Sequence, residues 1–325
     1  MHAITGCMKV LLQIILSHLT LLAKPQVSEY TCHMMQIGFR AHDLGTFSSV
    51  KELAKKAASY KKPVVIHLAM KKTITSALPP SRYTAEYVRS IHDDLASEGV
   101  GIAVVGSYVN PVHPDAEIRK QQLDDFVANL RFTKEFGCPI VGTETGSVNP
   151  NGSFTPDTSE PQVLDTFRAS LEYLLDAAEK YDAIVCIEAV SHAHTICSIE
   201  RMADIMDRYP TPHLGVIYDP VNLVGFTGIP ESDGSFRRHP SREAQKAFFD
   251  QALDAFGPRI RIIHVKDYVL TENGTKVGNL TAGTGVMDWN LFSDELDAYG
   301  IHVPCTLENL NPATLPQTLA FFHSS

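Results

Sequence analysis

Short apolar runs alternate with amphipathic segments along the chain from Met35 onward. Most of the apolar runs are rich in Val and Ile and have few polar interruptions, which is typical of parallel strands that are covered on both faces. The pattern predicts eight strands, at 35–39, 63–68, 101–106, 139–143, 183–188, 214–219, 260–265 and 302–308.

The segments between these runs have apolar residues at helical spacing, and several begin with Ser, Asp or Asn, as capped helices do. They predict helices at 49–60, 85–99, 116–137, 161–181, 198–209, 241–257, 288–300 and 311–322. Eight strand–helix units predict a (β/α)8 TIM barrel, which is an α/β fold with right-handed parallel connections. A doubly wound open sheet is the alternative, but "IGFRAHDLG" after the first strand lacks a Gly-rich phosphate loop.

The first 33 residues fit this pattern poorly, so we assign residues 34–325 to the barrel and residues 1–33 to an N-terminal extension or signal-like segment. Met8 to Pro25 combines a lysine with an apolar run, as signal peptides do. Gln13, Ser17 and His18 interrupt the run, and it is too short for a membrane span. No membrane partner is therefore expected, and a signal peptide stays the alternative to a plain extension.

Composition narrows the class of protein. The 325 residues carry a formal net charge of -9, and an acidic chain repels phosphate backbones, so no nucleic-acid partner is expected. The six cysteines are scattered and none forms a CxxC pair. We interpret them as reduced thiols, which favours a cytoplasmic protein.

Charged or ligand-forming side chains end four consecutive predicted strands: Glu188, Asp219, His264 and Glu308. The carboxyl ends of barrel strands meet at one mouth, so these side chains should converge there. Three crowded carboxylates would push one another toward protonation, and a divalent cation would remove that repulsion. Oxygen-rich ligands with one imidazole favour Mn²⁺, Mg²⁺ or Co²⁺, with Zn²⁺ left open. A single strand-end carboxylate more often caps a helix or pairs with Lys or Arg; the joint pattern is what favours a metal site.

Other polar residues follow the same strand ends, and we predict that they bind substrate. Lys266 lies two residues past His264 and should point to the same side. Asn222 lies about one turn past Asp219. The predicted substrate-binding residues are His67, Glu144, His194, Asn222 and Lys266. Asp288 and Trp289 are instead expected to cap and pack the helix that they open.

Several motifs together resemble the sugar phosphate isomerase/epimerase family with the xylose isomerase-like barrel. They are "IEAVSH", "VIYDPVN", "IHVKD", "GTGVMDW" and the late "LEN". The resemblance covers about Met35 to the C-terminus. It implies a single divalent metal held by the residues that match Glu188, Asp219, His264 and Glu308.

From these residues we expect a metal-dependent isomerase or epimerase of a small sugar, keto-sugar or polyol derivative. Glu188 and Glu308 are the candidate catalytic carboxylates, which would move a proton through a metal-stabilised enediolate. The alternatives are a dehydratase acting on an inosose-like or keto-acid substrate, a phosphodiesterase like the DNA-repair endonucleases, and a non-catalytic sugar-binding barrel. The oligomeric state is left open, a homo-oligomer included.

Two departures from the family bear on the substrate. The ketose 3-epimerase branch carries a histidine where this chain has Asn222, and an arginine where it has Leu270. A plain ketose 3-epimerase is therefore not favoured. The DNA-repair endonucleases carry a D-x-H pair after strand seven, which this chain lacks.

Overall fold

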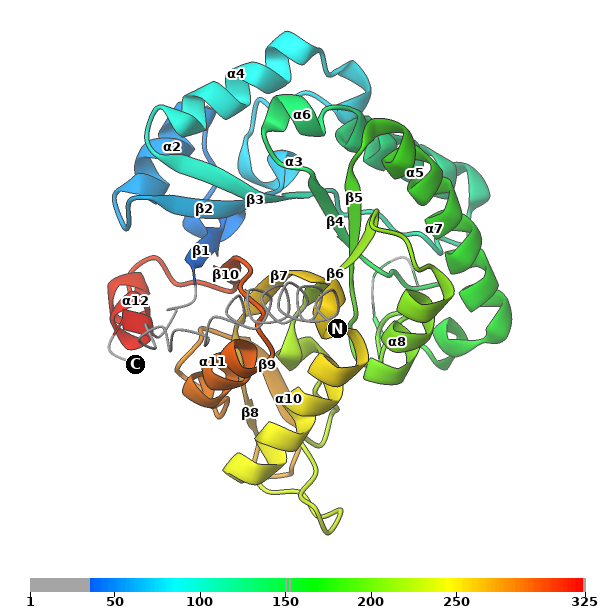
Figure 1. Ribbon diagram of the computed structural model, residues 1–325, viewed down its shortest axis with the longest axis vertical. Coiled ribbons are helices and arrows are strands. Elements are labelled where there is room, and N and C mark those ends of the chain that lie inside the picture. Colours follow the sequence, from blue (N-terminus) through cyan, green and yellow to red (C-terminus); the bar gives the residue numbers. More distant parts are fainter. Residues whose placement is uncertain (1–35, 150, 152, 324–325) are drawn as a thin grey trace, which may run out of the picture. The chain divides into compact units, whose positions relative to one another are not determined.

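A computed structural model describes residues 36–149, 151 and 153–323 of the chain. Its eight parallel strands close into a barrel in the order β1-β10-β7-β6-β5-β4-β3-β2, which confirms the predicted TIM barrel (Figure 1). The barrel strands are β1 (Ile37–Arg40), β2 (Val64–Leu68), β3 (Val100–Gly106), β4 (Ile140–Glu144), β5 (Ile184–Glu188), β6 (Leu214–Tyr218), β7 (Ile260–Val265) and β10 (Cys305–Leu307). The predicted N-terminal extension, residues 1–33, lies outside the described residues.

Helices follow the strands and surround the barrel (Figure 1). The longer ones are α2 (Val50–Ala58), α4 (Ala85–Ala96), α5 (Ala116–Arg131), α7 (Pro161–Tyr181), α8 (Ile199–Arg208), α10 (Arg242–Phe256), α11 (Trp289–Ala298) and α12 (Leu315–His323). Ser49, Thr84, Asp115, Ser198 and Ser241 each cap the helix that follows by accepting a backbone N–H, as Ser, Thr and Asp do at helix starts. Within the described part of the chain, no helix has the length and apolar character needed to cross a bilayer.

Short elements occupy the connections. They are η1 (Ala41–Leu44), α3 (Met70–Thr73), η2 (Pro80–Arg82), α6 (Thr133–Phe136), η3 (Pro156–Ser159), α9 (Pro220–Leu223) and η4 (Gly257–Arg259). The segment expected as one helix over 116–137 is split at Phe132 into α5 and α6. The predicted eighth strand is wrong at its start, because β10 begins at Cys305 rather than at 302. Pro304 precedes it and has no N–H to add to the sheet.

A second sheet was not predicted. β8 (Asp267–Leu270) and β9 (Lys276–Leu280) form an antiparallel hairpin directly after β7. β9 is only half-buried and has no continuous apolar run, so the pattern that predicts barrel strands is absent there. The hairpin lies at the carboxyl end of the barrel, beside the strand ends predicted to form the site.

The apolar core has two parts. The larger cluster fills the layer between strands and helices, and a smaller one contains Val104, Cys186, Ile217 and Ile262. Side chains alternate along a strand, so the last three of these residues point to the same side as the residues two positions later, Glu188, Asp219 and His264. Gly142 on β4 leaves room for this packing, since a Cβ there would lie 2.5 Å from Cδ1 of Ile217. An apolar layer therefore lies beneath the predicted ligands.

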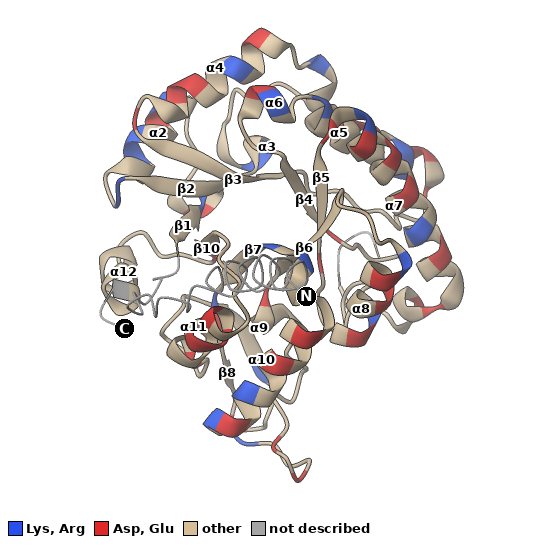
Figure 2. Cartoon of the chain, in the orientation of Figure 1, with Lys and Arg blue, Asp and Glu red and all other residues tan. Residues whose placement is uncertain are grey.

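Charged side chains are concentrated on the surrounding helices. Figure 2 shows Lys and Arg interspersed with Asp and Glu along α4, α5 and α7, whereas the barrel strands are largely uncharged. Cys138, Cys186, Cys197 and Cys305 are free thiols, as predicted for the described cysteines.

Candidate metal centre

Glu188, Asp219, His264 and Glu308 come together at the carboxyl end of the barrel. Each offers a ligand atom, and these atoms all lie within 4.8 Å of one another. Their exposed fractions are 4%, 2%, 0% and 3%. Side chains that lie far apart in sequence thus form one buried cluster, as the strand-end pattern predicted; their role as metal ligands stays a prediction.

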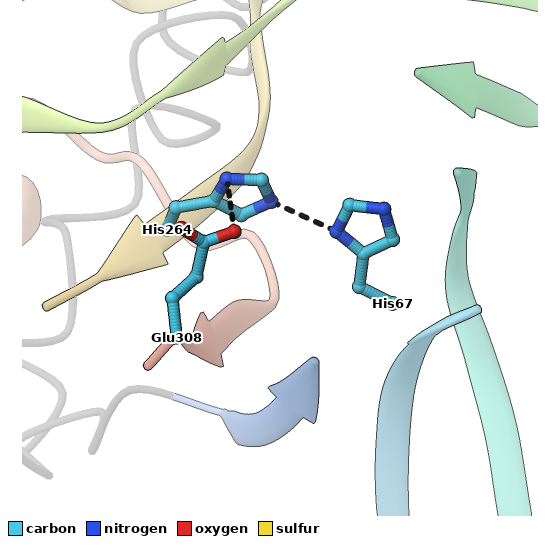
Figure 3. A group of neighbouring side chains, drawn as sticks. All are labelled: His67, His264 and Glu308. Carbon is cyan, nitrogen blue, oxygen red and sulfur yellow. Dashed lines mark hydrogen bonds and ion pairs between the residues drawn. The ribbon is translucent and has the colours of Figure 1, made fainter. Parts of the chain in front are cut away.

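Figure 3 shows His264 between the Glu308 carboxylate and a second histidine, His67. Nδ1 of His264 lies 3.1 Å from Oε1 of Glu188 and 3.1 Å from Oε1 of Glu308, and its Nε2 lies 3.1 Å from Nδ1 of His67. The Nδ1 atom is therefore the one that faces the cluster. An N–H on Nε2 that donates to His67 would leave Nδ1 free to bind a cation, which is how outer partners orient ligating histidines.

Two buried cations contact the same carboxylates. Nζ of Lys266 lies 2.6 Å from Oδ2 of Asp219 and 3.3 Å from Oε2 of Glu308. The guanidinium of Arg40, at the end of β1, lies 3.0 Å from Oε1 of Glu308 and pairs with Asp43 on its other side. Asp219 also caps α9, because its Oδ1 accepts the backbone N–H of Asn222 at 3.0 Å.

The carboxylates do not all shift toward protonation, which corrects the expectation from crowding. Burial raises the pKa of Glu188 to about 7, against the opposing charge of His264. Burial also acts to raise the pKa of Glu308, but the charges of His264, Lys266 and Arg40 outweigh it and hold that pKa well below the usual range. Burial lowers the pKa of His264, but Glu308 and Glu188 outweigh it and raise the value to about 9.

The predicted substrate-binding residues fall into two groups. His67, Asn222 and Lys266 contact the cluster itself, and Nδ2 of Asn222 donates to Oε1 of Glu188 at 2.7 Å. Glu144 and His194 pair with each other, with His194 Nε2 3.7 Å from Glu144 Oε2. Glu144 is aligned with Glu188 in the register of β4 and β5, so this pair lies at the same level of the barrel.

Sequence reasoning missed several residues around the cluster. Arg40 was overlooked because the first predicted strand ended at Phe39. The available signal was that Arg40 directly follows this apolar run, as Glu188 and Asp219 follow theirs. Tyr108, after β3, stacks on His67 with ring centroids 5.7 Å apart. Lys276, in the unpredicted hairpin, donates to the carbonyls of Val221 and Val224 at 2.7 Å each. Neither Tyr108 nor Lys276 ends a predicted strand, so no pattern marked them.

The motifs "HVKD" and "GTGVMDW" have a structural role that joins them. The buried Asp267 carboxylate accepts backbone N–H groups from Gly283 at 2.9 Å and Met287 at 3.1 Å. Gly285 lies so close that a Cβ there would be 2.2 Å from Asp267 Oδ1. Asp288 caps α11 and Trp289 is buried, as predicted.

The chemistry of the cluster fits a divalent cation. Three carboxylates and one imidazole nitrogen give the oxygen-rich donor set that hard and borderline divalent metals prefer. Oδ2 of Asp219 is buried and pairs with Nζ of Lys266 at 2.6 Å. A divalent cation would add positive charge among the three buried carboxylates and reduce their mutual repulsion.

The barrel and the cluster together define a TIM-barrel protein with a candidate divalent-metal centre at the carboxyl ends of its strands. The family model described as "Xylose isomerase-like TIM barrel" matches residues 70–324. The chain therefore belongs to the xylose isomerase-like TIM barrel family. Comparison with curated proteins gave no match.

Solved structures share the fold at low sequence identity. A xylose isomerase-like TIM barrel protein from Mycobacterium smegmatis in complex with magnesium has a TM-score of 0.65 and 14% identity, over 91% of this chain and 97% of that one. The 3-keto-D-glucoside 4-epimerase from E. coli has a TM-score of 0.62 and 14% identity, over 90% and 100%. D-psicose 3-epimerase with D-tagatose from Clostridium cellulolyticum H10 has a TM-score of 0.64 and 12% identity, over 89% and 99%.

Proposed function

We propose that this protein is a metal-dependent isomerase or epimerase of a small sugar, keto-sugar or polyol derivative. The observation that carries the proposal is the buried cluster of four ligand atoms within 4.8 Å at the carboxyl ends of the strands. Active sites of TIM-barrel enzymes are built at this end of the barrel. Similar structures that are named as sugar epimerases support the substrate class.

We propose Glu188, Asp219, His264 and Glu308 as the metal ligands. The donor set favours Mn²⁺, Mg²⁺ or Co²⁺ over a sulfur-seeking metal, with Zn²⁺ as a further candidate. Magnesium in the similar structure from Mycobacterium smegmatis supports this choice. When bound, the cation supplies Lewis acidity to the substrate's carbonyl and hydroxyl oxygens.

Glu188 and Glu308 are proposed to move the proton. Glu188 is the last residue of β5, and Glu308 directly follows β10. Because β6 and β7 lie between these two strands in the barrel, the two carboxylates approach the cluster from different sides. One carboxylate takes the proton from the carbon next to the carbonyl, which leaves an enediolate, and a carboxylic acid returns the proton. Return to the same carbon from the other face gives an epimer, and return to the neighbouring carbon gives an isomer.

The remaining polar groups are proposed to orient the substrate. Asn222 and Lys266 contact the carboxylates of the cluster through their N–H groups, and His67 contacts His264, so all three lie where they could orient a substrate. Glu144 and His194 form a pair on the neighbouring strand end, where they would bind hydroxyl groups farther from the reacting carbon.

Solvent-proton exchange tests the proposal. The protein loaded in turn with Mn²⁺, Mg²⁺, Co²⁺ or Zn²⁺ is incubated in D₂O with a panel of ketoses and inososes, and deuterium is followed by NMR. We expect deuterium at the carbon next to the carbonyl. Glu188→Gln and Glu308→Gln should each reduce the exchange rate by about 10²–10⁴-fold, the range expected for loss of a general acid–base group.

Glu295→Gln is the matched control, because Glu295 is a buried carboxylate on α11 that pairs with Lys246 at 2.7 Å, outside the barrel. It should keep the wild-type exchange rate. Metal content is measured for every variant, so that loss of the cation is separated from loss of proton transfer. Absence of exchange with all four metals, or wild-type exchange in both Gln variants, would contradict the proposal.

A further inference from the structure

Tyr108 is an aromatic residue at the mouth of the barrel that has no role in the proposed function. It lies two residues past the end of β3, and the backbone on both sides of it is fixed to β4. The N–H of Ser107 donates to the carbonyl of Gly142 at 2.9 Å, and the N–H of Val109 donates to Oγ1 of Thr143 at 3.2 Å. These bonds hold Tyr108 at a defined place on the rim of the barrel.

The register of β3 and β4 indicates the direction of the side chain. Gly106 is aligned with Gly142, so Tyr108 and Glu144, each two residues farther along, project to the same side. Glu144 is in turn aligned with Glu188, which belongs to the cluster of candidate ligands. Tyr108 and Glu144 are therefore neighbours at the mouth, on the side of the sheet that carries Glu188.

Three contacts hold the ring of Tyr108. It stacks on His67 with ring centroids 5.7 Å apart and an interplanar angle of 16°. The His42 ring contacts it edge-on at a centroid distance of 6.1 Å, and Nζ of Lys72 lies 3.5 Å from its centroid. His67 also stacks on the ring of His264, a candidate ligand, at 5.1 Å. The Tyr108 ring is thus packed against side chains that lead to the metal centre.

The hydroxyl group of Tyr108 takes no part in this packing. The residue is half-buried, and no hydrogen bond joins its hydroxyl to another of the described residues. Burial raises the pKa of Tyr108 well above its usual value, and the charges of Glu308 and Glu188 raise it further. The hydroxyl therefore stays protonated and can donate a hydrogen bond at the mouth of the barrel.

The groups beside this hydroxyl match a hydroxyl group of a substrate. An ionised Glu144 carboxylate only accepts hydrogen bonds, whereas the protonated Tyr108 can donate one. A substrate hydroxyl both donates and accepts, so a single hydroxyl satisfies the two residues. Neighbouring strands lie about 4.8 Å apart, which one oxygen with a hydrogen bond to each side can span. A carbonyl or an ionised acidic group has no proton to donate to Glu144.

We propose that Tyr108 is a substrate-binding residue of the candidate active site, and that its hydroxyl donates a hydrogen bond to a substrate hydroxyl that Glu144 also binds. Tyr108 then determines specificity for substrates that carry a hydroxyl at this position. This inference rests on the proposed function, because it takes the reacting carbon to be bound at the metal centre.

Tyr108→Phe tests the inference, because it removes the hydroxyl and keeps the ring that stacks on His67. The kinetics of deuterium exchange are measured with the metal-loaded full chain and the ketose or inosose that the wild type exchanges fastest. We expect kcat/KM to fall about 3–10-fold, as for the loss of one neutral hydrogen bond. The Kd of the metal, measured by calorimetry, should stay unchanged. An unchanged kcat/KM, or a fall matched by an equal loss of metal affinity, would overturn the proposal.

Tyr209→Phe is the matched control. The hydroxyl of Tyr209 donates to Glu172 at 2.7 Å, and Glu172 belongs to α7 in the outer layer of helices. The control variant should keep both the wild-type kcat/KM and the wild-type metal affinity.

Deoxy analogues of the same substrate locate the hydroxyl that Tyr108 binds. Removal of that hydroxyl should reduce kcat/KM in the wild type and have an effect at least about threefold smaller in Tyr108→Phe, where the hydrogen bond is already absent. Glu144→Ala should lose its sensitivity to the same hydroxyl. If every analogue affects wild type and Tyr108→Phe equally, or if Glu144 responds to a different hydroxyl, the proposed shared contact is wrong.

Wild-type exchange separates this inference from the proposed function. If the wild type exchanges no substrate, the proposed function fails and the role of Tyr108 fails with it. Exchange by the wild type that Tyr108→Phe leaves unchanged would remove only the role of Tyr108 and leave the isomerase or epimerase activity standing.

Discussion

At the scale of single residues, Lys276 shows how a charged side chain supports the site without joining the cluster. Its ammonium group donates to the carbonyls of Val221 and Val224, at the end of the short helix α9. That helix is capped by Asp219, a candidate ligand. Burial lowers the pKa of Lys276 to about 8, more than the charge of Asp219 raises it. The hairpin thereby fixes the segment from which Asp219 and Asn222 project.

This pKa predicts a pH dependence of stability. The folded-state pKa of about 8 lies below the ordinary value of 10.5, so the unfolded chain binds more protons between these values and the lysine's contribution becomes more favourable as pH rises through that window. The difference in free energy of unfolding between wild type and Lys276→Met should therefore increase from pH 8 to pH 10.5, as measured by urea unfolding. A constant difference would show that the two carbonyl hydrogen bonds offset the cost of burial.

At the scale of elements, one buried carboxylate organises the mouth of the barrel. Asp267 begins β8 and binds the backbone of the loop that leads to α11. Burial acts to raise the pKa of Asp267, and these backbone N–H groups oppose the shift by stabilising its charge. The loop is consequently held next to the end of β7, by a residue that lies three positions beyond His264 and one beyond Lys266. The segment "GTGVMDW" is therefore held beside the candidate site through Asp267, and it contributes no side chain to the cluster of candidate ligands.

Gly285→Ala tests this arrangement. The added Cβ would lie 2.2 Å from Asp267 Oδ1 and 2.3 Å from the carbonyl oxygen of Tyr268, so the loop must shift. We expect a loss of about 1–3 kcal/mol in the free energy of unfolding, the usual cost of overpacking. Gly278→Ala on β9 is the control, because its Cβ would make an ordinary 3.4 Å contact with Lys276 Cε; it should change stability by less than about 0.5 kcal/mol. Similar losses in both variants would contradict the structural role of the loop.

At the scale of the whole molecule, the candidate metal centre joins four strand ends into one unit. β5, β6, β7 and β10 are neighbours in the barrel, and a shared cation would connect all four. The barrel buries the three carboxylates close together. Arg40 pairs with Glu308 and Lys266 pairs with Asp219, and these ion pairs offset the repulsion between the carboxylates. Metal binding and folding should therefore be coupled.

Metal addition should raise the stability of the chain. A metal concentration of 100 times its Kd should add about 2.7 kcal/mol to the free energy of unfolding. Scanning calorimetry with Mn²⁺, Mg²⁺, Co²⁺ and Zn²⁺ measures this effect, which Asp219→Asn should abolish and Glu295→Gln should keep. If none of the four metals shifts the unfolding transition of the wild type, the assignment of the ligands is wrong.

Much of the fold and the centre of the site could be predicted, because both leave local patterns. Apolar runs with the right spacing mark each barrel strand, and the residue that ends a run marks the mouth, as Glu188 and Asp219 show. Tyr108 and Lys276 leave no such pattern. Each acquires its role only by contact with elements far away in sequence, His67 in one case and α9 in the other.

The sequence by itself determined the strand–helix order, the closed barrel and the identity of the polar residues at the strand ends, because burial of apolar runs and alternation along a strand are local constraints. The tertiary structure decided which cations compensate which carboxylates and how the hairpin supports α9. Those outcomes depend on distances between side chains, which chain spacing does not encode.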